Sequence, residues 1–449
     1  MNMHLPLVIG DTLFAGVSVY TGLFFMFHLN GSFRTIDLRQ LTFFIIGTIF
    51  VSYFLELYNL EKQMHKREFW FRIFAGLAGS LVAWTVIHYL IPAPLFLQKT
   101  LLTTLILFGI FQSLWHLGYQ SLLNSSYFTR KVLILGTGPL AKKIGDLIGQ
   151  SNRRHVLGGY YYLIEEPISV PISDILVKGN DLFQTAKKLK INKIVVSLTE
   201  RRGAFPLQEV LDCKFRGIEV VDAPSFYEYL TGKLMIEDIK PSWFIFADAF
   251  RVVPLMKLYK RAFDFVFSLI GLGLTLPFLP LMAFLIKMDS QGPVFYKQLR
   301  VGQMDTHFYL YKLRTMRRDA ERSTGAVWAQ ENDPRITRLG WFLRKTRIDE
   351  LPQLYNVLIG DMSFVGPRPE RPEFVEKLKS VIPYYSERHF VKTGITGWAQ
   401  IRYPYGASEK DALEKLRYDL YYIKNMSIFL DFSILLETIK VMLFGRGAR

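Results

Sequence analysis

Residues 346–369 read Thr-Arg-Ile-Asp-Glu-Leu-Pro-Gln-Leu-Tyr-Asn-Val-Leu-Ile-Gly-Asp-Met-Ser-Phe-Val-Gly-Pro-Arg-Pro. Two adjacent carboxylates, Asp349 and Glu350, precede a rigid Gly-Pro-Arg-Pro turn by about one short helix, and this turn presents Arg368. Carboxylate oxygens can attack phosphorus or bind a divalent cation, and a guanidinium matches the oxygens of a phosphate. The stretch therefore predicts phosphate chemistry in a locally helical region.

The two carboxylates should play separate roles. Adjacent helical residues project about 100° apart, so Asp349 and Glu350 should not share one proton. We expect one to attack and the other to hold a cation. The alternative is a solvated acidic pair at the start of a helix, where the helix dipole favours negative charge. The first interpretation is favoured by the basic residues nearby, namely Lys312, Arg314, Arg344, Lys345 and Arg347.

The composition indicates a membrane setting. Half of the 449 residues are hydrophobic, and 55 Lys and Arg exceed 39 Asp and Glu, a formal charge of +16. Such a surplus suits anionic lipid headgroups, nucleotides or nucleic acid. Because long apolar segments accompany it, we expect a lipid bilayer and a nucleotide substrate, and no nucleic acid. The single cysteine excludes an intrachain disulfide and a cysteine zinc site.

The first 125 residues predict four transmembrane helices. Their apolar stretches, each near the length of about 20 residues that spans a bilayer, are 8–29, 41–58, 73–92 and 101–123. No basic residue or small-residue cleavage pattern marks a signal peptide at the N-terminus. Lys and Arg gather in the loop 59–72 and after the fourth stretch. The positive-inside rule then places everything after residue 125 in the cytoplasm.

The middle of the chain alternates strand and helix patterns. Residues 131–138 indicate a buried strand that enters a Gly-x-Gly turn, and 139–150 indicate the following helix. Further predicted elements are strands at 194–197 and 218–221 and a helix at 207–214. We expect a small Rossmann-like α/β domain over 126–225 and a linker over 226–256. The glycines suit either a bound nucleotide or close packing of the helix.

A second apolar region does not look like a simple span. No residue from 265 to 286 is charged, but basic residues flank both ends, and Pro277 and Pro280 lie in the middle. Both flanks should stay on the cytoplasmic side, and proline breaks a helix. We expect a re-entrant helix at 263–287 that dips into one leaflet. A kinked full span is the alternative.

Several long motifs in one order resemble the monotopic phosphoglycosyl transferases, also called bacterial sugar transferases. They lie within the predicted domain 257–449, at residues 312–316, 349–353, 360–369, 392–400 and 419–425. The whole chain resembles the long form of that family, the exopolysaccharide polyprenyl glycosylphosphotransferases. The expected fold is a membrane protein with a four-helix transmembrane front, a small α/β domain and a mostly helical catalytic domain.

The resemblance implies transfer of a sugar 1-phosphate from a UDP-sugar to undecaprenyl phosphate, with release of UMP. This reaction would start exopolysaccharide, capsule or O-antigen synthesis at the bacterial inner membrane. Asp349 would be the nucleophile, and Glu350 would bind Mg²⁺. Arg368 would hold phosphate; Lys312, Arg314 and Arg347 are further candidates. Asp419 matches an acid near the site, and Pro277 matches the proline that breaks the re-entrant helix.

Two other functions remain open from the sequence. A nucleotide-sugar dehydratase or epimerase with NAD would use the α/β domain but lacks a Tyr-x-x-x-Lys pair near it. A non-enzymatic scaffold of polysaccharide assembly would not need the acid pair and Arg368. The sequence does not name the sugar; glucose or galactose is expected. A homodimer through the helices or the middle domain is a further expectation.

Overall fold

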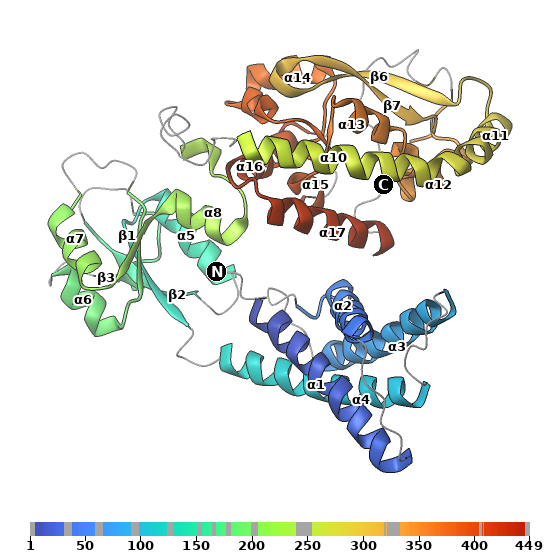
Figure 1. Ribbon diagram of the computed structural model, residues 1–449. Helices are drawn as coiled ribbons and strands as arrows, with labels where there is room; N and C mark the ends of the chain where they lie inside the picture. Colours follow the sequence, from blue (N-terminus) through green and yellow to red (C-terminus); the bar gives the residue numbers. More distant parts are fainter. Residues whose placement is uncertain are drawn as a thin grey trace. The chain divides into compact units, whose positions relative to one another are not determined.

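The computed structural model of the chain divides into two compact units, residues 1–221 and 222–449 (Figure 1). The structure describes residues 5–30, 38–58, 66–90, 98–123, 129–150, 155–163, 168–176, 181–198, 205–238, 254–317, 320, 333–403, 406 and 408–444. Within these ranges the chain combines many helices with a parallel sheet. Together with its long apolar helices, this confirms the expected class of a membrane-associated protein with an α/β part.

Four helices form in the four apolar regions of the first unit. They are α1 (Leu5–Asn30), α2 (Leu38–Phe54), α3 (Lys66–Leu90) and α4 (Gln98–Leu123). Buried side chains from all four meet in one core, which includes Val19, Phe44, Trp84 and Phe108. Among the described residues, α1, α4 and the segment Pro254–Asp289 are long and apolar enough to cross a membrane, whereas Leu41–Phe54 in α2 is shorter.

The rest of the first unit is a five-stranded sheet in the order β3-β2-β1-β4-β5. The strands are β1 (Arg130–Leu135), β2 (His155–Tyr161), β3 (Ile175–Leu176), β4 (Lys193–Val196) and β5 (Glu219–Asp222). Strand β1 pairs in parallel with β2 and β4. The predicted strands and helices of this region therefore form where the hydrophobic pattern places them.

Helices cover both faces of this sheet (Figure 1). Helices α6 (Leu182–Leu189) and α7 (Leu207–Phe215) share a core with Leu133 and Leu135 of β1. Helix α5 (Pro139–Gln150), which follows the glycine turn, lies on the other face. Gly136 has φ of 119°, in the left-handed region that glycine favours, so the turn out of β1 needs this residue.

The expected linker 226–256 begins with ordered structure. Helix α8 (Ala223–Thr231) and the 3₁₀ turn η2 (Ile236–Asp238) belong to the second unit. Glu228 pairs with Lys424 at 2.6 Å, and Trp398 Nε1 donates to the carbonyl of Gly232 at 2.8 Å. Residues 239–253 lie outside the described residues.

A broken helix opens the main part of the second unit. Helix α10 (Pro254–Thr275) is followed by a 3₁₀ turn, η4 (Leu276–Phe278), and then by α11 (Leu279–Asp289). Pro277 lies in the 3₁₀ turn, where the chain changes direction (Figure 1). Because proline lacks a backbone donor and clashes with the preceding turn, the interruption has a local cause. Only 6% of an apolar 18-residue stretch of this segment is buried within the protein.

The core of the second unit surrounds helix α16 (Glu409–Lys424). Its buried residues Leu416, Leu420 and Ile423 pack with Val365 and with Ile434 of α17 (Ile428–Phe444). Two small sheets lie beside this core: β6 (Phe295–Val301) with β7 (His307–Leu313), antiparallel, and β8 (Ser363–Val365) with β9 (Gly394–Thr396), parallel. Further elements of this unit are α12 (Arg338–Lys345), α13 (Gln353–Ile359), α14 (Pro372–Val381), α15 (Trp398–Arg402) and the 3₁₀ helix η7 (Tyr385–Phe390).

Helix α10 positions the elements that carry the acid pair and the turn. The Arg261 guanidinium donates to the carbonyls of Val357 and Leu358, at 2.8 and 2.7 Å, and so binds the C-terminal end of α13. The buried Asp264 accepts hydrogen bonds from Ser363 Oγ at 3.1 Å and from the backbone N–H of Phe364 at 3.0 Å. The broken helix is thereby attached to α13, which follows the carboxylates, and to β8, which precedes the Gly-Pro-Arg-Pro turn.

Candidate active site

The acid pair lies in a short 3₁₀ turn, η6 (Ile348–Glu350), between α12 and α13. Helix α12 ends at Lys345 and is capped by Thr346, and Arg347 takes a left-handed conformation with φ of 56°. That reversal turns the chain so that Asp349 and Glu350 point into the unit, where they are 6% and 7% exposed. The pair is therefore not a solvated helix cap. Buried carboxylates require compensation from nearby charges.

Three cations surround the carboxylate of Glu350. Its Oε1 accepts from Lys312 Nζ at 3.1 Å and from Arg368 Nη2 at 2.9 Å, and its Oε2 lies 3.3 Å from Arg347 Nη1. Lys312 comes from β7 and Arg368 from the Gly-Pro-Arg-Pro turn, so residues far apart in the sequence meet at one carboxylate. The side chain of Arg368 is still 41% exposed, which leaves it accessible to a ligand.

The two adjacent carboxylates have different electrostatic environments. Burial raises the pKa of Asp349, and the charge of Glu350 adds to this effect although Lys312 opposes it. For Glu350 burial acts in the same direction, but Lys312, Arg368 and Arg347 outweigh it and hold its pKa well below the usual range. Glu350 is thus a firmly ionised group, whereas the anion of Asp349 is poorly stabilised. A poorly stabilised carboxylate is the better nucleophile of the two.

The Gly-Pro-Arg-Pro turn is held from several sides. The N–H of Gly366 donates to the carbonyl of Thr396, and the N–H of Gly394 donates to the carbonyl of Pro367, both at 2.9 Å. A side chain on Gly366 would place its Cβ 2.2 Å from the carbonyl oxygen of Lys392, so only glycine fits there. The turn is consequently locked against β9 and presents Arg368 in one orientation.

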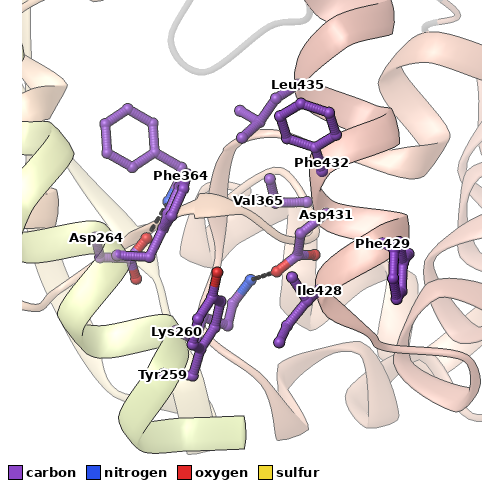
Figure 2. A pocket seen from close by; sticks show the side chains of 11 residues that line it. Tyr259, Lys260, Asp264, Phe364, Val365, Ile428, Phe429, Asp431, Phe432 and Leu435 are labelled. Carbon is purple, nitrogen blue, oxygen red and sulfur yellow. Dashed lines mark hydrogen bonds and ion pairs between the residues drawn. The ribbon is translucent and has the colours of Figure 1, made fainter. Parts of the chain in front are cut away.

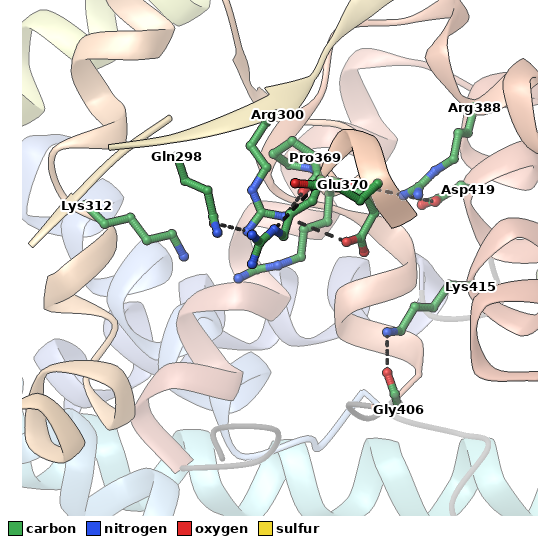
Figure 3. A network of polar contacts seen from close by, with 12 residues as sticks. Gln298, Arg300, Lys312, Pro369, Glu370, Arg388, Gly406, Lys415 and Asp419 are labelled. Atoms are coloured by element: carbon green, nitrogen blue, oxygen red, sulfur yellow. Dashed lines mark hydrogen bonds and ion pairs between the residues drawn. The ribbon is translucent and has the colours of Figure 1, made fainter. Parts of the chain in front are cut away.

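Two further arginines fix the backbone of this turn (Figure 3). Arg388 Nη2 donates to the carbonyl of Arg368 at 3.0 Å, and Arg300 Nη1 donates to the carbonyl of Pro369 at 3.1 Å. Arg388 comes from η7 and Arg300 from β6. From the sequence, Arg300 counted only as one of the basic residues that flank the apolar segment, and Arg388 was not singled out. That both bind the backbone of one turn follows from the tertiary structure.

Asp419 contacts this support rather than the acid pair. Its Oδ2 lies 2.8 Å from Arg388 Nη2, and both side chains are almost fully buried. Arg388 also donates to the hydroxyl of Tyr385 at 2.6 Å. Asp419 on α16 therefore orients Arg388, which in turn holds the backbone of Arg368.

We expect the Asp419→Ala substitution to reduce both stability and activity. Removing one partner of a buried ion pair leaves the other charge unpaired, at a cost of about 3–5 kcal/mol in the free energy of unfolding. The double variant Asp419→Leu with Arg388→Met should recover much of that stability, because an apolar pair of similar volume avoids the buried charge. Activity should not recover, since Arg388→Met also removes the donor to the carbonyl of Arg368. Thermal unfolding and turnover are measured side by side. Recovery of both stability and activity in the double variant would contradict this account.

Two further residues that the sequence assigned to the site lie away from the acid pair. The Arg314 guanidinium donates to the carbonyls of Ile286, Ser290 and Pro293, at distances between 2.5 and 3.1 Å. It therefore binds the C-terminal end of α11, where helix carbonyls lack partners, and the structure does not bring it to the acid pair. Pro277 lies at the break of the apolar helix. Lys312, Arg347 and Arg368 are the predicted basic residues that the structure gathers at Glu350.

The donor set around Glu350 fits a magnesium ion only together with a substrate. Among the residues that the structure describes, no group of three or more His, Cys, Asp or Glu could hold a metal. Mg²⁺ commonly binds one or two carboxylates and takes its other oxygens from substrate phosphates and water. Glu350, held in its ionised form beside Asp349, meets that requirement. The ion would compete with Lys312 and Arg368 for the oxygens of Glu350.

Comparison with known proteins identifies the family. Residues 255–445 match the family described as bacterial sugar transferase. An Aeromonas hydrophila protein named UDP-N-acetylgalactosamine-undecaprenyl-phosphate N-acetylgalactosaminephosphotransferase is 41% identical over 237 residues, which cover 53% of this chain and 55% of that relative. This chain thus spans about half the length of that relative.

Two more relatives have names that describe similar transferases. A Bacillus subtilis (strain 168) protein, provisionally named undecaprenyl-phosphate N-acetylgalactosaminyl 1-phosphate transferase, is 57% identical over 129 residues, covering 29% of this chain and 72% of the relative. The undecaprenyl-phosphate glucose phosphotransferase of Komagataeibacter xylinus is 43% identical over 196 residues, covering 42% and 37% of the two chains. With the buried acid pair and the Gly-Pro-Arg-Pro turn in place, the chain belongs to the bacterial sugar transferase family.

Proposed function

We propose that this protein transfers a sugar 1-phosphate from a UDP-sugar to undecaprenyl phosphate, the first step of an exopolysaccharide, capsule or O-antigen. The observation that carries the proposal is a buried Asp349 next to a Glu350 that Lys312, Arg347 and Arg368 surround. A buried nucleophile beside clustered cations suits a diphosphate substrate. The names of the three relatives support this function over a dehydratase or a scaffold.

In the first half of the reaction, a carboxylate oxygen of Asp349 attacks the phosphorus that carries the sugar. A bond forms between that oxygen and phosphorus, and the bond from phosphorus to the bridging oxygen of UMP breaks. UMP leaves with the electron pair of that bond. Burial of Asp349 favours the attack because the anion is poorly solvated. Arg368 and Lys312 hold the phosphate oxygens, where negative charge is concentrated.

In the second half, a phosphate oxygen of undecaprenyl phosphate attacks the same phosphorus. The acyl phosphate bond to Asp349 breaks, the carboxylate is regenerated, and the sugar diphospholipid forms. Splitting the reaction in this way avoids bringing two anionic substrates together in a low-dielectric site. The acceptor and the donor then use the site in turn, and ping-pong kinetics are expected.

The proposed cofactor is Mg²⁺, with Glu350 as the protein ligand. The bound ion supplies neutralisation of the diphosphate and of the departing UMP. The residues of the chain keep the other tasks. Lys312, Arg347 and Arg368 keep Glu350 ionised, and the turn that Arg300 and Arg388 support keeps Arg368 beside it.

The membrane arrangement that we propose follows from the apolar helices. Helices α1 to α4 form four spans, and the α10–η4–α11 segment is re-entrant, broken at Pro277 with basic residues at both ends. The catalytic domain then faces the cytoplasm at the bacterial inner membrane, where the headgroups of lipid substrates lie. The sheet with α5, α6 and α7 is proposed as a Rossmann-like domain, and a homodimer is proposed for the whole chain.

A panel of UDP-sugars tests the function and identifies the sugar. Glucose or galactose was the expectation from the sequence, but the Bacillus and Aeromonas relatives are named for N-acetylgalactosamine. We therefore expect UDP-N-acetylgalactosamine to give the fastest UMP release with undecaprenyl phosphate and Mg²⁺. Faster release from UDP-glucose would reassign the sugar. If no UDP-sugar released UMP, the proposed reaction itself would be wrong.

A further inference from the structure

An apolar cavity opens beside the broken helix (Figure 2). It has a volume of about 160 Å³ and lies between the first half of α10, strand β8 and helix α17. Most of the side chains that line it are aromatic or aliphatic: Phe263, Phe364, Val365, Phe429, Phe432 and Leu435. None of the catalytic candidates lines this cavity, so it is a separate feature of the second unit.

Two of the three charged residues that line the cavity neutralise each other, and the third, Asp264, accepts hydrogen bonds from Ser363 Oγ and from the N–H of Phe364. Lys260 Nζ lies 2.7 Å from Asp431 Oδ2, and the hydroxyl of Tyr422 donates to Asp431 Oδ1 at 2.7 Å. Lys260 also donates to the hydroxyl of Tyr422 at 2.9 Å. Because these groups satisfy one another, the cavity offers a ligand mainly hydrocarbon surface. An anionic headgroup has little to bind there, whereas an apolar chain does.

The cavity is continuous with apolar surface that must face lipid. Phe429 is 88% exposed and Phe432 is 58% exposed at its edge on α17, and Tyr259 of α10 is 45% exposed. Helix α10 itself belongs to the segment Pro254–Asp289, which exposes large apolar side chains along its length, such as Phe265, Leu274 and Phe278. Exposed apolar surface of this extent requires hydrocarbon around it. A lipid chain can therefore enter the cavity from the bilayer.

The cavity is also close to the phosphate-binding turn. Its wall includes Phe364 and Val365 of β8, and Arg368 follows Val365 by three residues. Three residues span at most about 11 Å between their Cα atoms. The Cα atom of Arg368 thus lies within about 11 Å of the cavity wall, a distance that the first isoprenoid units of a lipid phosphate can bridge.

From these observations we propose that the cavity binds part of the isoprenoid chain of the acceptor lipid. This inference rests on the proposed function and adds the place where the acceptor is held. An engineered apolar cavity of about 150 Å³ accommodates benzene, so a volume near 160 Å³ holds about one five-carbon unit. The cavity binds the isoprenoid chain near its phosphate, and the rest of the isoprenoid chain stays in the bilayer.

The test separates the two halves of the reaction. Leu435→Trp fills the cavity, and Phe429→Ala removes an exposed part of its edge. Both variants should be labelled by UDP-N-acetylgalactosamine, without acceptor, at the rate of the wild type. The KM for undecaprenyl phosphate should rise about tenfold in Leu435→Trp and several-fold in Phe429→Ala. Phe284→Ala is the matched control, because Phe284 is 62% exposed on α11 and does not line the cavity.

Each result has one meaning. If the wild type is not labelled by any UDP-sugar, the proposed function fails. If the wild type and Phe429→Ala are labelled and their KM values for undecaprenyl phosphate agree, the cavity does not bind the acceptor. Loss of membrane retention with an unchanged KM would show a structural phospholipid in the cavity and would also overturn the proposal. Should Leu435→Trp fail to fold, Phe429→Ala carries the test, since its side chain is 88% exposed.

Discussion

Asp349→Asn is expected to abolish UMP release, with or without undecaprenyl phosphate. The amide has nearly the same shape as the carboxylate but cannot form the bond to phosphorus. Loss of a covalent nucleophile commonly costs roughly 10⁴-fold or more in turnover. Because Asp349 is buried and its anion is poorly stabilised, the neutral amide should not destabilise the fold. UMP release by the purified variant, at saturating UDP-sugar, measures the effect.

Glu376→Gln is the matched control for this experiment, because Glu376 is an exposed carboxylate on α14. This control should keep the rate of the wild type. A variant at Asp349 that retained a tenth or more of the wild-type rate would show that the side chain does not act as the nucleophile. Thermal unfolding of both variants should match that of the wild type, so that a lost activity cannot be ascribed to a lost fold.

Glu350→Gln should produce the second largest loss, on the order of 10²- to 10³-fold in turnover. The neutral amide removes the proposed magnesium ligand and also the charge that Lys312, Arg347 and Arg368 share. The half-saturating concentration of Mg²⁺ should rise markedly. Glu350→Asp keeps the charge and should retain a magnesium response closer to that of the wild type.

A magnesium titration of UMP release distinguishes the two roles of Glu350. If Glu350→Gln lowers turnover but leaves the magnesium response unchanged, the residue only positions the three cations and another group binds the ion. The midpoint temperature of thermal unfolding should also fall in Glu350→Gln, because three cations lose their shared counter-charge. Equal stability of the variant and the wild type would contradict the ion-pair geometry of the site.

Local sequence patterns predicted most of the secondary structure of the α/β part of the first unit. The hydrophobic alternation placed β1, α5, β4, α7 and β5 within a residue or two of where they lie, because these elements bury one or both faces. The prolines at 277 and 280 predicted an interruption in the apolar helix, and η4 lies there. Family membership, expected from the motifs of residues 312–425, is confirmed by the family comparison.

Tertiary contacts could not be predicted in the same way. Arg314, part of the motif 312–316, was expected among the phosphate-binding candidates, yet it binds carbonyls at the end of α11. Arg300 and Arg388 were not predicted as site residues, although both support the turn that carries Arg368. The sequence shows that a residue is basic, but it does not show which group the residue binds. Which arginine meets carbonyls and which meets carboxylates depends on how β6, η7 and α11 pack.

The left-handed backbone at Arg347 is a further feature that the sequence concealed. A non-glycine residue with φ of 56° is uncommon, and no local sequence pattern predicts this conformation. Yet this conformation ends α12 and turns both carboxylates into the interior. It explains why an acid pair that would usually lie in solvent is buried and has two distinct environments.

Mapping a covalent adduct on the wild-type protein tests the central claim most directly. The enzyme is incubated with UDP-N-acetylgalactosamine and Mg²⁺ without acceptor, digested, and its peptides are analysed by mass spectrometry. The account predicts a sugar phosphate on the side chain of Asp349, which disappears when undecaprenyl phosphate is added. Release of UMP upon acceptor addition, with no adduct on that residue under any condition, would show direct transfer and contradict the account.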